Sequence, residues 1–203
     1  MTLFGLIRFS LWLAVILICF ILFKKSNIRN KRRVFCFSLV AVIVLGTISY
    51  VVPVENALIT FQSPESAFHY TNSGDIELVL EGQNTDMVVS SKNEIYTYTL
   101  LPKNNHGWKI GLGADIKTIV QKISEDVIVE VYQYKNSNDY FITVFVTDGG
   151  AADVSDNQGS TFYSLSQYND VLDSYYDTYY AHIQNWNDQY ILTVNGKTLN
   201  LHT

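Results

Sequence analysis

The chain has 203 residues, enough for one or two domains, and its hydrophobic fraction of 48% is ordinary for a folded protein. The net charge of −5 conceals two unlike parts, because all 19 acidic residues lie at or after Glu55 and no arginine follows Arg33. An acidic segment without arginine is a poor match for phosphate backbones, so nucleic acid is excluded as a partner of residues 55–203. That segment also lacks cysteine, which excludes a disulfide framework and a thiolate metal site there.

Two apolar runs, residues 3–23 and 34–54, are each 21 residues long and carry almost no charge. A helix needs about 20 apolar residues to cross the hydrocarbon core, so both runs are predicted to be membrane spans. Arg8 lies near the start of the first run, from where its head group can reach the lipid headgroups. The first run is followed by Lys24 and Lys25 rather than by a signal-peptidase site, so we expect it to be retained.

The connection between the runs, residues 24–33, decides the expected orientation. It holds six of the 14 basic residues, namely Lys24, Lys25, Arg29, Lys31, Arg32 and Arg33. By the positive-inside rule such a loop lies in the cytoplasm, which puts both termini outside. These cations can also contact anionic lipid headgroups, although topology alone is sufficient reason for them. Residues 1–54 are therefore expected to form a transmembrane helical hairpin.

Residues 55–203 are expected to form an extracytoplasmic, mainly antiparallel β domain with one or two short helices, so the fold class is α+β. A linker over 55–61 leads to Ser63-Pro64-Glu65, which is typical of a helix start, and the helix ends near Gly74. Alternating apolar residues then predict a meander. Its strands are expected over residues 76–80, 87–89, 95–101 and 107–111.

The pattern then changes to helical spacing. Apolar residues at 116, 119, 120 and 123 predict a helix over 114–126, capped by Asp115. Two long strands, 127–134 and 140–146, form a hairpin, and a loop over 148–160 follows. The path of residues 159–180 stays open between loop, strand and short helix. Further strands are expected over 179–184, 190–194 and 197–201, the last two joined by an Asn195-Gly196 hairpin turn.

Tyrosine is the most informative residue type in the outer domain. Seven of the 14 tyrosines fall between Tyr163 and Tyr190. Because tyrosine offers contact area at low entropy cost, the candidate partner-binding residues are Tyr175, Tyr176, Tyr179 and Tyr180. The alternative is sheet packing, in which aromatic residues are common. Adjacent residues in a strand face opposite ways, which favours some of these rings lying outside the core.

Residues 148–160 offer the next candidate chemistry. Asp153, Ser155 and Asn157 alternate as oxygen ligands of a cation would, but no closing glutamate follows, and a polar turn-rich loop is the simpler interpretation. No histidine has a second ligand at zinc spacing, and no nucleophile motif occurs. We therefore predict no catalytic, cofactor-binding or metal residues. A hydrolase would need Asp148, Asp153 or Asp156 to meet His106 in one cleft.

Three short motifs carry a resemblance to a known group of proteins. They are Pro64-Glu65-Ser66-Ala67-Phe68, the strand from Asp75 to Gly82, and Gly107-Trp108-Lys109. Together they resemble small uncharacterised two-span membrane proteins of Gram-positive bacteria, in which P-E-x-A-F begins a strand-rich outer domain. The resemblance covers residues 63–146 and implies a bacterial envelope protein without implying an activity.

The function expected from the sequence is non-enzymatic binding at the outer face of a bacterial cell membrane. The ligand is a partner protein, a peptide or a wall polymer. One alternative is an immunity-type protein, whose acidic surface intercepts a toxin or cationic peptide in a salt-sensitive way. The others are an envelope hydrolase and an accessory subunit of a membrane complex that is contacted through the hairpin.

Overall fold

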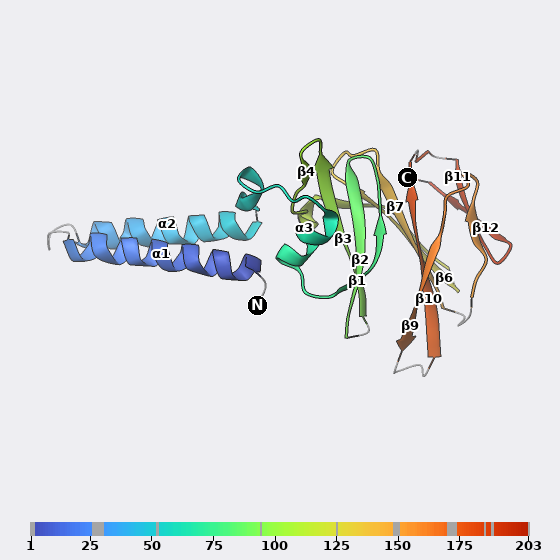
Figure 1. Cartoon of the computed structure of the whole chain (residues 1–203), viewed down its shortest axis with the longest axis horizontal. Helices are drawn as coiled ribbons and strands as arrows, with labels where there is room; N and C mark the ends of the chain where they lie inside the picture. The colour runs from blue at the N-terminus through green and yellow to red at the C-terminus, as the bar shows by residue number, and fades with distance from the viewer. Residues whose placement is uncertain are drawn as a thin grey trace. The chain divides into compact units, whose positions relative to one another are not determined.

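The computed structural model describes residues 3–25, 31–51, 53–93, 95–124, 126–147, 151–169, 174–184, 186–187 and 189–202 (Figure 1). The chain divides into two compact units. The helical unit comprises Met1–Ile59 with His69–Ser73, and the β unit comprises Thr60–Phe68 with Gly74–Thr203. The predicted α+β class is confirmed, since an apolar N-terminal helix precedes a mainly antiparallel β domain with few helices.

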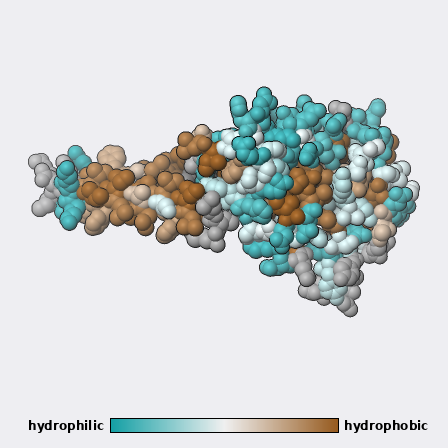
Figure 2. Space-filling view, viewed as in Figure 1, coloured by the Kyte–Doolittle hydropathy of each residue, from teal (hydrophilic) through white to brown (hydrophobic). Residues whose placement is uncertain are grey.

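The helical unit contains α1 (Leu3–Lys25) and α2 (Lys31–Val51), which lie side by side. Within the described residues, Gly5–Lys25 is the one stretch long and apolar enough to cross a bilayer, and the apolar part of α2, Arg33–Ile48, is shorter. Figure 2 shows hydrophobic side chains over most of the visible surface of these helices. An N-terminal helix suited to membrane anchoring is thus present, and the second span stays a prediction.

The two helices approach closely where Trp12 of α1 lies over Gly46 of α2. A Cβ atom added to Gly46 would lie 2.4 Å from Cη2 of the indole ring. The missing side chain therefore makes the space that Trp12 occupies.

The second apolar run ends earlier than predicted. α2 stops at Val51, and Val54–Ala57 form a short 3-10 helix, η2, with Pro53 as its N-cap. Proline has no N–H to donate and disfavours helical geometry in the residue before it, so a helix is not expected to continue through Pro53. The helix of the second apolar run therefore ends before the predicted span does, the boundary at residue 54 stays a prediction, and the predicted linker over 55–61 begins as 3-10 helix.

A short helix, α3 (Pro64–Thr71), precedes the sheets, and its residues up to Phe68 belong to the β unit. Ser63 is its N-cap, as predicted, because the Ser63 Oγ accepts the Ser66 N–H over 3.2 Å. A four-stranded antiparallel sheet follows in the order β1-β2-β3-β4. Its strands are β1 (Asp75–Leu80), β2 (Thr85–Lys92), β3 (Ile95–Asn104) and β4 (Gly107–Trp108). The predicted meander is confirmed.

A five-stranded antiparallel sheet has the order β5-β6-β7-β10-β9. Its strands are β5 (Ile116–Ile123), β6 (Val127–Tyr134), β7 (Tyr140–Val146), β9 (Tyr163–Asn169) and β10 (Ser174–Ile183). The β6–β7 hairpin confirms the prediction. The segment whose path was open, 159–180, supplies strands to one side of this sheet, and residues 170–173 lie outside the described part of the chain.

The predicted helix over 114–126 is wrong, because the segment forms β5 after a short 3-10 turn, η3 (Gly113–Asp115). The pairing of β5 with β6 shifts register between Thr118 and Val120. A bulge places one extra residue in a strand, so apolar residues that would alternate become spaced as on a helix face. The β-branched residues of this segment suit the extended backbone.

A three-stranded antiparallel sheet has the order β12-β11-β8. It is built from β8 (Val154–Asp156), β11 (Tyr190–Val194) and β12 (Lys197–Leu201). The Asn195-Gly196 turn joins β11 to β12 as predicted, and both residues have positive φ, 49° and 77°. The prediction that residues 148–160 are all loop is wrong, because Val154–Asp156 form β8. Residues 148–150 lie outside the described range.

The core of the β unit lies in successive layers. Phe68 of α3 packs with Val88 and Leu101 on one face of the four-stranded sheet. Met87 and Leu100 point to the opposite face and pack there with residues of the five-stranded sheet. This alternation is what the pleat of a strand requires.

The five-stranded sheet is covered on both faces. One face meets the four-stranded sheet, and the other packs against the three-stranded sheet, where Val144 and Ile183 lie in one cluster with Leu192. The described side chains of β6, β7 and β10 are therefore buried or half-buried, whereas the outer strands β5 and β9 carry exposed residues.

Candidate functional site

The four tyrosines predicted to bind a partner do not form one exposed face. Tyr179 and Tyr180 point to opposite faces of β10, but both faces are covered, and the two residues are 6% and 5% exposed. The partner-binding prediction is therefore wrong for Tyr179 and Tyr180, which are core residues. Tyr176 is half-buried and packs edge-on against Phe145, with ring centroids 4.5 Å apart. The side chain of Tyr175 lies outside the described part of the structure.

The basic residues predicted for topology lie at the paired ends of the two helices. Lys24 and Lys25 end α1, and Lys31, Arg32 and Arg33 begin α2. Lys24, Lys25 and Arg33 are exposed. Arg29 falls outside the described residues.

The residues named for a hydrolase are not brought together. His106 lies in the β3–β4 turn of the four-stranded sheet, whereas Asp156 ends β8 in the three-stranded sheet beyond the central layer. Asp156 is occupied by structural bonds, since it accepts the Tyr190 hydroxyl over 2.7 Å and the Ser160 N–H over 2.9 Å. Asp148 lies outside the described residues. Among the residues described, no cluster of His, Cys, Asp and Glu is placed to hold a metal ion.

Of the three residues considered as cation ligands, Asp153, Ser155 and Asn157, Asn157 makes hydrogen bonds that stabilise the fold. Asn157 donates its amide to the Gln189 carbonyl over 2.8 Å and accepts the Ile191 N–H over 3.1 Å. Asp153 and Ser155 are exposed. The segment thus ties β8 to β11, which agrees with the simpler interpretation of a polar, turn-rich connection.

Two buried carboxylates, Asp86 and Asp139, were not identified as candidates from the sequence. Asp139 is 1% exposed and accepts the N–H groups of Gln83 and Asn84, each over 2.6 Å. Its Oδ1 also lies 3.0 Å from His182 Nε2. Burial raises the pKa of Asp139, but these contacts outweigh it and leave the pKa below its ordinary value.

Asp86 supports the other side of the same turn between β1 and β2. It is 0% exposed and accepts the Gly82 N–H over 3.0 Å, the Lys103 ammonium over 2.7 Å and the Trp108 indole N–H over 2.6 Å. Both carboxylates thus stabilise the β1–β2 turn through these hydrogen bonds. The aspartate–histidine pair looks like a catalytic dyad in isolation, but its bonds assign it a structural role.

A hollow in the described part of the β unit is suited to binding, and we name it the loop-end cleft. It measures about 330 Å³. It lies where the β5–β6 turn, the end of β7 and the β11–β12 turn meet. The residues that line it are Ser124, Asp126, Val127, Val146, Val194, Asn195, Lys197 and Leu199.

The loop-end cleft combines an aliphatic floor with a charged rim. Val127, Val146 and Val194 are 8%, 3% and 2% exposed. At the rim, Lys197 Nζ lies 2.9 Å from Asp126 Oδ2, and these side chains are 76% and 37% exposed. An exposed ion pair contributes at most about 1 kcal/mol, so a ligand can exchange partners with it at little cost.

Backbone bonds hold the walls of the cleft in place. The Thr147 N–H donates to the Asp126 carbonyl over 3.0 Å, and the Ser124 N–H donates to the Val127 carbonyl over 2.9 Å. Asn195 and Asp153 are joined by two bonds of 2.9 Å. The hollow is therefore preformed, as binding sites usually are.

Leu199 of β12 is the half-buried apolar residue that lines the cleft. Ile123 precedes the lining residue Ser124 and is 70% exposed, but it pairs with Ile128, on the face of the sheet opposite Val127, and so does not face the cleft. Ile95, at the start of β3 in another sheet, is 59% exposed and offers a comparison residue.

Comparison with known proteins adds no relative. No protein-family model, curated protein or solved structure matches this chain. The resemblance to P-E-x-A-F membrane proteins stays a prediction.

Proposed function

We propose that this chain is a bacterial cell-membrane protein with two spans, α1 and α2, a cytoplasmic loop over residues 24–33, and both termini outside. After its three basic residues α2 continues from Val34 to Val51, and at about 1.5 Å per residue this part covers about 27 Å, close to the roughly 30 Å of the hydrocarbon core. The six cations of the connection support the orientation.

We propose further that the β unit is a binding domain rather than an enzyme, and that it contacts a partner protein or peptide through the loop-end cleft. The observation that carries this proposal is the preformed aliphatic floor, with the half-buried Leu199 in its lining, beside an exposed ion pair. Apolar pockets with a polar rim are the usual sites of strong interface contacts.

The chemistry of the cleft describes the partner. An aliphatic or aromatic side chain would enter the floor, and a charged group would pair with Asp126 or Lys197. Residues 55–203 hold all 19 acidic residues of the chain, which favours a partner of positive charge. The same observation favours a second candidate function, an immunity-type protein that intercepts a cationic toxin or antimicrobial peptide.

Site-specific cross-linking in intact cells tests this proposal. A photoreactive amino acid is placed at position 199, in the lining of the cleft, or, as the control, at position 95 of the full chain. We expect one stoichiometric partner to be captured from position 199 and not from position 95. With the partner identified and purified, we expect Leu199→Ala to weaken binding at least about tenfold, as loss of a central apolar contact does. Ile95→Ala is expected to leave binding within about twofold.

Three results would contradict the proposal. Capture of the same species from both positions, or binding that survives Leu199→Ala, would show that the cleft is not the contact site. Turnover of a wall fragment by the purified chain would contradict the non-enzymatic assignment.

A further inference from the structure

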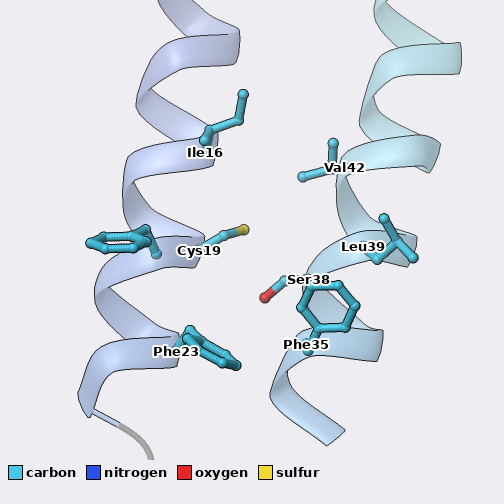
Figure 3. Close-up of a pocket in the computed structure, with 8 residues that line it drawn as sticks. Ile16, Cys19, Phe23, Phe35, Ser38, Leu39 and Val42 are labelled. Atoms are coloured by element: carbon cyan, nitrogen blue, oxygen red, sulfur yellow. The ribbon is translucent and has the colours of Figure 1, made fainter. Parts of the chain in front are cut away.

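α1 and α2 enclose an apolar crevice of about 400 Å³ at the end of the helical unit that adjoins residues 24–33. It is lined by Ile16, Cys19, Phe20, Phe23, Phe35, Ser38, Leu39 and Val42. Figure 3 shows Cys19 and Ser38 pointing toward one another across the crevice, with Phe23 and Phe35 on the two sides of its loop end.

The crevice is open because small side chains face each other where larger ones would meet. Cys19 and Ser38 leave a gap between helices, whereas Phe23 and Phe35 approach with ring centroids 6.4 Å apart. Water cannot fill an apolar gap in a bilayer, and a dry gap forfeits dispersion contacts. A hydrocarbon chain is the occupant that restores those contacts.

Positive charge lies directly beyond the loop end of the crevice. Lys24 and Lys25 follow Phe23 in α1, and Lys31 and Arg33 precede Phe35 in α2. Lys31 Nζ lies 5.6 Å from the centre of the Phe23 ring. A molecule whose hydrocarbon part fills the crevice would therefore place its polar end among these cations.

We propose that the crevice binds an acyl chain of an anionic phospholipid of the cytoplasmic leaflet, whose headgroup contacts Lys24, Lys25, Lys31 and Arg33. The inference rests on the proposed two-span topology. From Phe35 to Val42 the crevice extends about 10 Å along α2, enough for part of an acyl chain. Charge complementarity selects an anionic over a zwitterionic headgroup. A second copy of this chain is disfavoured, because its own cations would meet the same cations.

Photolabelling in vesicles tests the inference. The full chain is reconstituted with a phosphatidylglycerol or a phosphatidylcholine that carries a photoreactive group on its acyl chain. We expect peptides from residues 16–23 and 35–42 to be labelled preferentially by phosphatidylglycerol, by about fivefold for each cation that contacts the headgroup. Replacing Lys24, Lys25, Lys31 and Arg33 by glutamine should abolish the preference.

The two native cysteines offer a matched pair of variants. Cys19→Phe fills the crevice and is expected to remove most of the labelling there. Cys36 does not line the crevice, so Cys36→Phe is expected to leave the labelling unchanged. Equal labelling by the two lipids, or unchanged labelling in Cys19→Phe, would overturn the inference. So would a Cys19–Cys19 cross-link between copies whose yield does not depend on the lipid.

A protease-protection measurement on the same vesicles separates this inference from the proposed topology. A chain whose loop over 24–33 and C-terminal region lie on the same side of the membrane contradicts the topology. A chain with the expected protection but no lipid preference contradicts the lipid site alone.

Discussion

Arg8 and Glu55 form an ion pair with two hydrogen bonds across 47 residues of the chain. Arg8 Nε donates to Glu55 Oε1 over 2.9 Å, and Arg8 Nη2 donates to Oε2 over 3.1 Å. The side chains are 14% and 5% exposed. From the sequence, Arg8 is expected to reach lipid headgroups, but in the structure a carboxylate pairs with it instead. The pair joins α1 to η2, directly after α2, and thereby fixes which helix ends are neighbours.

Breaking this pair on one side should cost more than removing it altogether. Glu55→Gln leaves a guanidinium without its counter-charge, and we expect it to lower the free energy of unfolding by about 3 kcal/mol. Arg8→Leu combined with Glu55→Leu should cost less than either single change, because no unpaired charge remains. Denaturation of the purified chain in detergent measures all the variants. Strictly additive losses would show that the two residues are not coupled.

The same pair predicts a dependence on pH. Burial raises the pKa of Glu55, but its bonds to Arg8 outweigh burial and hold the pKa below its ordinary value of 4.5. A carboxyl group of lowered pKa stabilises the folded state fully above its ordinary pKa and loses that contribution as the pH falls through the lowered one. We expect Glu55→Gln to reduce the loss of stability of the helical unit below about pH 4.5. If Glu55→Gln lost as much stability below about pH 4.5 as the unchanged chain does, this assignment would be contradicted.

Asp139 makes the corresponding prediction for the β unit. Its lowered pKa, set by His182 and the N–H groups of Gln83 and Asn84 against the opposing effect of burial, means that its contribution is present above its ordinary pKa of 3.8 and is lost below it. Asp139→Asn should lower the free energy of unfolding by about 3 kcal/mol at neutral pH, because backbone donors lose a charged acceptor. In this variant the free energy of unfolding should also fall less steeply as the pH is lowered below about 3.8.

The exposed Asp153 supplies the control for Asp139. Asp153→Asn is expected to change the free energy of unfolding by less than about 0.5 kcal/mol. Chemical denaturation between about pH 7 and pH 2 distinguishes the two variants. Equal effects would show that the buried carboxylate does not hold the β1–β2 turn.

Most of the fold follows from local sequence signals. Ser63-Pro64-Glu65 specifies the start of α3, and Asn195-Gly196 specifies the last hairpin, because both depend on residues within one turn of each other. The strand β5 could not be predicted in the same way. Its bulge between Thr118 and Val120 produces helical spacing in a strand, and only pairing with β6 reveals it.

The candidate sites were less accessible to sequence reasoning. Tyr179 and Tyr180 point to opposite faces as expected, but another sheet covers each of these faces. No local sequence pattern predicts those covering sheets. Asp139 meets Gln83 across 56 residues, a separation that carries no local signal. The loop-end cleft likewise depends on turns that are distant in the chain, although the Asn195-Gly196 turn at its rim was recognisable.

The contact between Trp12 and Gly46 is a test of how the helices pair. Gly46→Val places atoms where the indole ring lies, since even a Cβ would be 2.4 Å from it. We expect this variant to separate the helices and to lower the stability of the helical unit by about 1–3 kcal/mol, as overpacking does. Trp12→Leu in the Gly46→Val background should recover part of the loss by making room. Proximity of the helices is measured by distances between spin labels on α1 and α2, and unchanged distances in Gly46→Val would contradict the observed packing.

The ion pair at the rim of the loop-end cleft separates a binding role from a structural one. Exchanging the two residues, with Asp126→Lys and Lys197→Asp together, keeps an ion pair of the same kind but reverses the charge that each wall offers. Because exposed pairs contribute at most about 1 kcal/mol, we expect the free energy of unfolding to change little. A partner that pairs with one wall would meet a like charge, and binding should weaken at least about tenfold, mainly at low salt. The measurement is the affinity for the partner captured from position 199, taken at low and high ionic strength. An unchanged affinity in the exchanged variant would show that the rim charges do not contact the partner.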